Sequence, residues 1–156
     1  MEINCRILRA ADSLDYRKVR LESLTFHPEC FGSDYHQESK RPKLYFQQLL
    51  ESESTTGLML GAFAGQKLVG LCGLIPSSGE DIEIIQMYVG AEYRGTGAGL
   101  KLLSLAKHCL SRLGGKALVL KVFEDNQSAL ATYQKAGFSI KQRQDKDIFM
   151  VFTPGS

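Results

Sequence analysis

Hydrophobic and polar residues alternate along several short segments of the chain, and this alternation predicts strands. The first such segment spans residues 3–9. Asp12 follows it and is placed to cap a helix that continues to about Phe26. The pair His27-Pro28 then ends the helix, because proline lacks a backbone N–H group and restricts the residue before it. Residues 27–33 are therefore expected to form a loop.

The middle of the chain predicts a second helix and then a β-hairpin. The helix begins after Asp34 and reaches about Leu50, but Pro42 lies inside it and is expected to kink or split it. Two apolar segments, 58–64 and 67–75, flank a two-residue glycine turn and predict a pair of antiparallel strands.

The remaining elements alternate between strands and helices. Aromatic and β-branched residues predict a strand over 82–89, and the helical spacing of leucine and alanine predicts a helix over 97–113. Asn126 is placed to cap a short helix that ends at Gly137, where glycine suits a left-handed backbone. Three further segments predict strands, the last two as a hairpin: 117–123, 138–144 and 147–153.

The resulting order of elements, β-α-α-β-β-β-α-β-α-β-β, is typical of an α/β fold. We expect one domain over residues 1–156, with a mixed central sheet of about seven strands flanked by about four helices. No repeat, low-complexity segment or linker interrupts the pattern. A chain of 156 residues is also long enough to bury a hydrophobic core.

Composition and charge argue against several classes of function. The 19 basic and 17 acidic residues are mixed along the chain, so no run of one sign can follow a nucleic-acid backbone. The longest nearly apolar run, residues 68–76, is far shorter than the ~20 residues of a membrane-spanning helix. The amino terminus lacks the basic and apolar regions of a signal peptide. We therefore expect a cytoplasmic protein that binds neither nucleic acid nor membranes.

The spacing of cysteine and histidine predicts no metal site. The cysteines lie far apart, without the close pairs typical of zinc sites and redox motifs: Cys5, Cys30, Cys72 and Cys109. We interpret them as reduced and mostly buried thiols. The three histidines share no ligand spacing either.

A glycine-rich turn over residues 93–99, Tyr-Arg-Gly-Thr-Gly-Ala-Gly, carries the strongest chemical signal. It lies between a strand and a helix, so glycine and the helix dipole can direct backbone N–H groups at a pyrophosphate. A turn without a ligand is the alternative. The dinucleotide fingerprint fails because its sixth position, counted from Gly95, is Leu100. A mononucleotide P-loop fails because Gly99 is not followed by Lys-Ser or Lys-Thr.

Two motifs together resemble those of the GNAT-type N-acetyltransferase family. Arg94, Gly97 and Gly99 match its Arg/Gln-x-x-Gly-x-Gly/Ala signature, and residues 126–138 are similar to its Asn-x-x-Ala…Tyr-x-Lys-x-Gly-Phe segment. The predicted order of elements, over nearly the whole chain, is also that of the family. The resemblance implies an enzyme that transfers an acetyl group from acetyl-coenzyme A to a primary amine of a small molecule or protein.

The resemblance also implies how acetyl-coenzyme A binds. Arg94 contacts a phosphate or is merely solvated, and Asn126 hydrogen-bonds the pantetheine arm or acts only as a helix cap. The pantetheine arm pairs with backbone groups of Met87, Tyr88 and Val89, and the N–H of Val89 can bind the thioester oxygen. Backbone N–H groups of the following turn bind the pyrophosphate: Gly95, Thr96, Gly97, Ala98, Gly99 and Leu100.

Two side chains are candidates for proton transfer. An alkylamine, with a pKa of about 10.4, must lose a proton before it attacks a thioester. Glu83 lies where several family members carry a general base, and burial would raise its pKa into a useful range. Alternatively, Glu83 lies at a solvated strand edge or forms an ion pair, and a water chain acts as the base. Tyr133 corresponds to the family's general acid, unless it is only a core aromatic; Tyr88 is the weaker substitute.

The acceptor and the class of protein stay open. The resemblance places the acceptor side at about residues 24–45, where Glu29, Asp34 and Glu38 either attract an ammonium group or are only solvated. A coenzyme-binding sensor without catalysis and a nucleotide-binding protein are the alternatives to an enzyme. Homodimers are common in the family.

Overall fold

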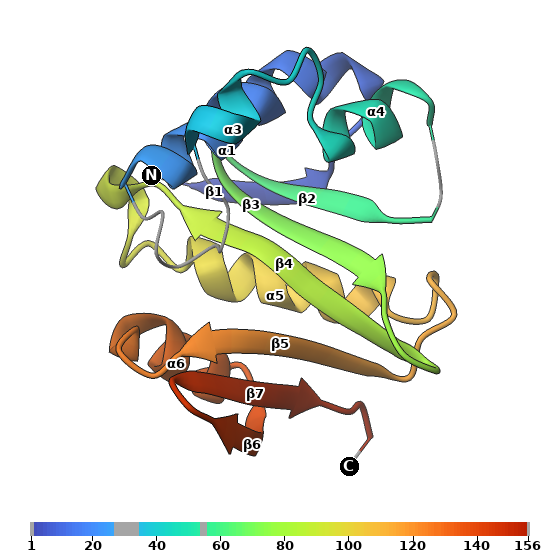
Figure 1. Ribbon diagram of the computed structural model, residues 1–156, viewed down its shortest axis with the longest axis vertical. Helices are drawn as coiled ribbons and strands as arrows, with labels where there is room; N and C mark the ends of the chain where they lie inside the picture. Colours follow the sequence, from blue (N-terminus) through green and yellow to red (C-terminus); the bar gives the residue numbers. More distant parts are fainter. Residues whose placement is uncertain (1, 27–34, 54–55, 156) are drawn as a thin grey trace.

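The computed structural model describes residues 2–26, 35–53 and 56–155, and its strands form one seven-stranded sheet (Figure 1). The strands are β1 (Ile3–Ile7), β2 (Leu58–Ala64), β3 (Lys67–Pro76), β4 (Asp81–Val89), β5 (Ala117–Phe123), β6 (Ser139–Gln144) and β7 (Asp147–Phe152). Their order across the sheet is β1-β2-β3-β4-β5-β7-β6. Among these strand pairs, β4 and β5 are parallel and the others antiparallel. The predicted mixed α/β sheet is confirmed.

Helices cover both faces of the sheet (Figure 1). They are α1 (Ser13–Phe26), α3 (Tyr35–Ser39), α4 (Tyr45–Glu51), α5 (Ala98–Cys109) and α6 (Gln127–Lys135). On one face, α1 and α4 bury Tyr16 and Phe46 against β2, β3 and β4. On the other face, α5 and α6 bury Leu102 and Leu130 in a second core. Four of the helices in the described ranges have seven or more residues, in agreement with the predicted number.

The predicted second helix is split around Pro42. Helix α3 ends at Ser39 and α4 begins at Tyr45, so the connection between them contains the proline. Arg17 of α1 holds this connection, because its guanidinium donates hydrogen bonds to the carbonyl oxygens of Ser39, at 3.1 Å, and Arg41, at 2.9 Å.

Two predictions about helix ends are wrong. Asp12 does not cap α1: it ends a 3-10 turn, Ala10–Asp12, and its carboxylate accepts hydrogen bonds from the backbone of Arg9 and the guanidinium of Arg6. Helix α5 ends at Cys109 rather than at Leu113, because the chain then forms turns. The N–H of Gly115 closes this end by donating to the carbonyl oxygen of Leu110, at 3.0 Å.

Replacing Asp12 with asparagine should lower the Tm at neutral pH. The hydrogen-bonded Arg6 guanidinium, 2.8 Å away, holds the pKa of the Asp12 carboxyl below its usual value. A carboxyl whose folded-state pKa is lowered stabilises the fold above its unfolded pKa and loses that effect as the pH falls through the folded value. The Tm difference between the two proteins, measured by calorimetry, should therefore shrink below about pH 4. A difference independent of pH would contradict the ion pair.

The described cysteines agree with the prediction of buried, reduced thiols. Cys72 and Cys109 are buried and Cys5 is partly buried, and all three are free. Burial raises the pKa of the Cys72 and Cys109 thiols, which keeps them protonated and unreactive. Cys30 lies outside the described residues, as do Glu29 and Asp34 of the expected acceptor side.

Candidate functional site

A pocket opens where β4 and β5 separate. The two strands pair only over Asp81–Glu83 and Ala117–Val119, although β4 continues to Val89 and β5 to Phe123. Beyond these pairs, backbone groups of the two strands no longer bond to each other and face the space between them. The pocket has a volume of about 860 Å³, which is in the range of sites that hold a cofactor or substrate.

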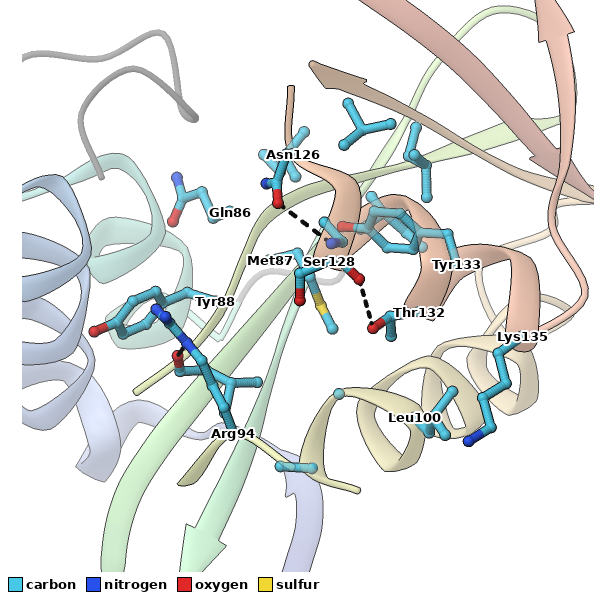
Figure 2. Close-up of a pocket in the computed structure, with 18 of the residues that line it drawn as sticks. Gln86, Met87, Tyr88, Arg94, Leu100, Asn126, Ser128, Thr132, Tyr133 and Lys135 are labelled. Atoms are coloured by element: carbon cyan, nitrogen blue, oxygen red, sulfur yellow. Dashed lines mark hydrogen bonds between the residues drawn. The ribbon is translucent and has the colours of Figure 1, made fainter. Parts of the chain in front are cut away.

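All residues predicted to catalyse or to bind the coenzyme line this one pocket. Figure 2 shows part of this lining. They come from β4 and the turn after it, from the first turn of α5, and from α6 with its cap. These segments are separated in the chain, so only the fold brings them together. The assigned roles of these residues remain predictions.

The glycine-rich turn at one end of the pocket has the backbone expected of an anion site. Gly95 and Gly97 adopt φ angles of 79° and 87°. A Cβ at either position would meet nothing within 4 Å, so left-handed backbone rather than crowding requires glycine. Gly97 is the N-cap of α5, and the first intrahelical hydrogen bond runs from the N–H of Lys101 to its carbonyl oxygen. The earlier N–H groups have no intrahelical acceptor and favour an anion.

The charges around the pocket also favour an anionic ligand. Arg94, Lys121 and Lys135 are its basic lining residues, and Glu83 is its acidic one. All three basic side chains are exposed. Arg94 additionally donates a hydrogen bond from Nε to the carbonyl oxygen of Val89, at 3.3 Å, which ties the turn to the end of β4.

Helix α6 begins and ends as the sequence predicts. The Oδ1 atom of Asn126 accepts a hydrogen bond from the N–H of Ala129, at 3.2 Å, so its role as a cap is confirmed (Figure 2). Gly137 has a φ of 97° and ends the helix in left-handed backbone. The predicted contact of Asn126 with a pantetheine arm stays a prediction.

Tyr133 belongs both to the pocket and to the core. Its ring is 7% exposed and packs against Phe138, with ring centroids 5.9 Å apart. It projects from α6 on the side of the pocket where Asn126 also lies (Figure 2). The two interpretations of this tyrosine, core aromatic and pocket residue, are therefore compatible.

Glu83 lies in the middle of the sheet. It pairs with Ile75 of β3 on one side and Val119 of β5 on the other, which rules out the strand-edge alternative. Its flanking residues, Ile82 and Ile84, point into the core beneath α5, so Glu83 points to the opposite face. The side chain is half-buried rather than enclosed, and no ion pair joins it to a described Lys or Arg.

Tyr88 points away from Tyr133 (Figure 2). Its ring is buried against α1, and its hydroxyl donates a hydrogen bond to Glu22 Oε2, at 2.8 Å. Burial and this hydrogen bond raise the pKa of Tyr88 above its ordinary value. The phenol therefore lies on the wrong side of β4 to replace Tyr133 as a proton donor, while its backbone still lines the pocket.

Several pocket residues escaped the sequence analysis. Gln86 is a polar residue within an apolar strand, and its polarity alone does not predict a place in the pocket. Lys121 alternates with buried Leu120 and Val122 on β5, and Lys135 lies in the second motif. The position of Lys135 near the start of α5 depends on the packing of α6 against α5, which brings Thr132 Cγ2 within 3.6 Å of a Cβ built at Gly99.

Neither a metal-binding cluster nor a membrane-spanning helix is found among the described residues. Within ranges 2–26, 35–53 and 56–155, no group of three or more His, Cys, Asp or Glu side chains is arranged to hold a metal ion. None of the helices in those ranges is long and apolar enough to cross a membrane.

Comparison with known proteins bears directly on this geometry. A family model described as the acetyltransferase (GNAT) family matches residues 17–138, which include both motifs and the separated strands. The chain belongs to the GNAT acetyltransferase family. The resemblance inferred from the two sequence motifs is thereby confirmed.

Solved GNAT structures share the fold over nearly the whole chain. A PaiA N-acetyltransferase from Thermoplasma acidophilum, in complex with coenzyme A, matches with a TM-score of 0.80 and 25% identity, covering 98% of this chain and 99% of that one. The yncA protein of Salmonella typhimurium, with acetyl-coenzyme A as its cofactor, has a TM-score of 0.76 over 100% and 96% of the two chains. Its 15% identity shows the fold alone.

Curated relatives are named for different compounds. A mycothiol acetyltransferase of Corynebacterium efficiens is 31% identical over 130 residues, which are 81% of this chain and 40% of that protein. A spermine/spermidine N(1)-acetyltransferase of Bacillus subtilis is 30% identical over 94 residues, 55% of this chain and 62% of that protein. This GNAT chain thus spans less than half the length of the mycothiol acetyltransferase that it matches.

Proposed function

We propose that this protein transfers an acetyl group from acetyl-coenzyme A to a primary amine of a small molecule. The observation that carries the proposal is the pocket between β4 and β5, which joins the N-terminal turn of α5 to Glu83 and Tyr133. Membership of the GNAT family and the coenzyme A bound to the Thermoplasma relative support it.

The residues of the pocket fit the parts of the coenzyme. The N–H groups from Gly95 to Leu100 bind the pyrophosphate, with Arg94 and Lys135 as neighbouring positive charges. The separated end of β4 offers the backbone of Met87, Tyr88 and Val89 to the amide groups of the pantetheine arm, as a sheet edge binds an added strand. When bound, acetyl-coenzyme A supplies an activated acyl group as a thioester.

The amine and the thioester approach from opposite faces of the sheet. Glu83 projects to the face that carries α1 and α4, whereas Tyr133 belongs to the core of α5 and α6. Glu83 accepts a proton from the amine, whose nitrogen then forms a bond to the carbonyl carbon. As the bond from carbon to sulfur breaks, the N–H of Val89 binds the carbonyl oxygen and Tyr133 donates its proton to the thiolate. The second proton lost by the nitrogen passes through water to Tyr133 and restores its hydroxyl.

The proposal of a small-molecule acceptor rests on the relatives. The mycothiol and spermine/spermidine acetyltransferases are named for small molecules, and their matches extend over 81% and 55% of this chain. These names differ from each other, so they indicate a class of acceptor rather than one compound.

A thermal-unfolding titration tests coenzyme binding first. Acetyl-coenzyme A and coenzyme A at about 100 times Kd should stabilise the fold by about 2.7 kcal/mol and raise the Tm by several degrees. NADH and ATP, which lack the pantetheine arm, should raise the Tm less at the same concentrations. A faster release of the coenzyme A thiol in the presence of an amine would then establish catalysis. Binding without thiol release for any amine would instead favour an acyl-coenzyme A sensor, and no shift with either coenzyme would contradict the proposal.

Replacing Glu83 with glutamine should lower kcat/KM by about tenfold while the Tm remains close to that of the wild type. The effect is modest for a general base because the half-buried position leaves water able to take part of its role. The measurement is the rate of thiol release against pH for the best amine of the screen. Unchanged activity in Glu83→Gln would favour a water chain as the base.

A further inference from the structure

A β-bulge interrupts β4 beside the pocket. The register of β3 and β4 passes from Gly73 opposite Ile85 to Leu71 opposite Tyr88, so two residues of β4 lie opposite one of β3. The extra residue is accommodated at Gln86, whose φ of 56° is left-handed backbone that residues with a side chain rarely adopt. Gln86 immediately precedes residues 87–89, which line the pocket.

Tyr16 of α1 holds the side chain of Gln86. The Tyr16 hydroxyl donates a hydrogen bond to Gln86 Oε1, at 2.6 Å. Tyr16 is 1% exposed and packs edge-on against Phe46, so its hydroxyl is fixed by the core around it. Burial also raises the pKa of Tyr16, which keeps its hydroxyl protonated and able to donate.

Strand β3, which pairs with the bulged part of β4, has a glycine on each side of the bulge. A Cβ built at Gly73 would lie 3.0 Å from the carbonyl oxygen of Ile85, and one at Gly70 would lie 3.0 Å from that of Tyr88. Glycine thus lets β3 approach β4 closely on both sides of the bulge. Gln86, which has the left-handed backbone and accepts the hydrogen bond from Tyr16, lies between these two close approaches.

We propose that Tyr16 is a positioning residue that acts through Gln86, holding the bulge so that residues 87–89 present their backbone groups to the pantetheine arm. The inference rests on the proposed function. Tyr16 does not line the pocket, so it acts on the coenzyme only through β4. Helix α1, on the acceptor side, is thereby connected to the strand that binds the coenzyme.

Calorimetric titration with two ligands tests this role. Coenzyme A carries the pantetheine arm, whereas adenosine 3′,5′-bisphosphate carries nucleotide phosphates without it. Tyr16→Phe should weaken coenzyme A binding about fivefold, the value of one hydrogen bond, and leave the affinity for the bisphosphate unchanged. In a Gln86→Gly background, Tyr16→Phe should have no further effect, because the carboxamide is gone and glycine adopts left-handed backbone unaided.

Ser13→Ala is the matched control. Ser13 is a buried α1 residue that donates to Glu51, at 2.6 Å, and accepts from Gln47, at 3.2 Å, so the variant loses hydrogen bonds to α4 instead of β4. It should lower the Tm and keep the affinity for coenzyme A. Equal weakening of both ligands by Tyr16→Phe, or equal effects of Tyr16→Phe and Ser13→Ala, would overturn the positioning role. A wild type that binds neither ligand would overturn the proposed function and this inference with it.

Discussion

Replacing Tyr133 with phenylalanine is expected to lower kcat by two to three orders of magnitude, about 100- to 1000-fold, with little change in the Kd for coenzyme A. The substitution removes only the hydroxyl group, which we propose as the proton donor to the departing thiolate. The ring remains, so its packing against Phe138 and its burial on α6 are preserved. The measurement combines the rate of thiol release at saturating amine with a thermal titration of coenzyme A.

Ser139→Ala is the control for this experiment. Ser139 is exposed at the start of β6 and does not line the pocket, so removing its hydroxyl should leave kcat unchanged. A Tm for Tyr133→Phe close to that of the wild type would show that the fold is retained. Full turnover by Tyr133→Phe would reject its assignment as general acid and leave it as a core aromatic that borders the pocket.

Replacing Gly97 with valine should weaken the binding of coenzyme A by about 100-fold, equivalent to losing one or two hydrogen bonds to a charged group. Gly97 has a φ of 87° at the N-cap of α5, and a β-branched residue strains there. Relief of that strain turns the N–H groups of the following residues away from the pyrophosphate. Calorimetric titration below the Tm of the variant measures the change in affinity.

Gly65→Val separates binding from strain. Gly65 has a φ of 61° in the turn between β2 and β3, and a Cβ there meets nothing within 4 Å, as at Gly97. The two variants should therefore lose similar stability, and only Gly97→Val should lose affinity. If both variants bind coenzyme A as the wild type does, the glycine turn is not the pyrophosphate site.

Elements governed by local signals could be predicted closely. The hairpin strands expected at 58–64 and 67–75 correspond to β2 and β3, because short apolar runs and a glycine turn are signals that act within a few residues. Asp12 could not be placed correctly, since its carboxylate binds the guanidinium of Arg6 from β1 instead of the N–H groups of α1. A cap is a local interaction only while no tertiary partner competes for the same side chain.

The residues of the candidate site also divide into those that local motifs predict and those that depend on tertiary contacts. The glycine turn, the Asn126 cap and Tyr133 could be found because both motifs are short and the geometry each requires is local. Gln86 was missed because a bulge depends on the neighbouring strand. The half-buried environment of Glu83 could not be predicted from its apolar neighbours in the chain, because the exposure of a residue in the middle of a sheet depends on what packs over that face.

By itself, the sequence determined the order and type of the elements, the glycine-rich turn and the two motifs of the family. Only the tertiary structure decided that β4 and β5 separate after a short pairing, that β4 bulges at Gln86, and that Glu83 and Tyr133 border one pocket from opposite faces. The physical reason is the range of the interactions involved. Propensities and caps act between neighbours, whereas the contact of Tyr16 with Gln86 joins residues 70 positions apart, and no local pattern encodes it.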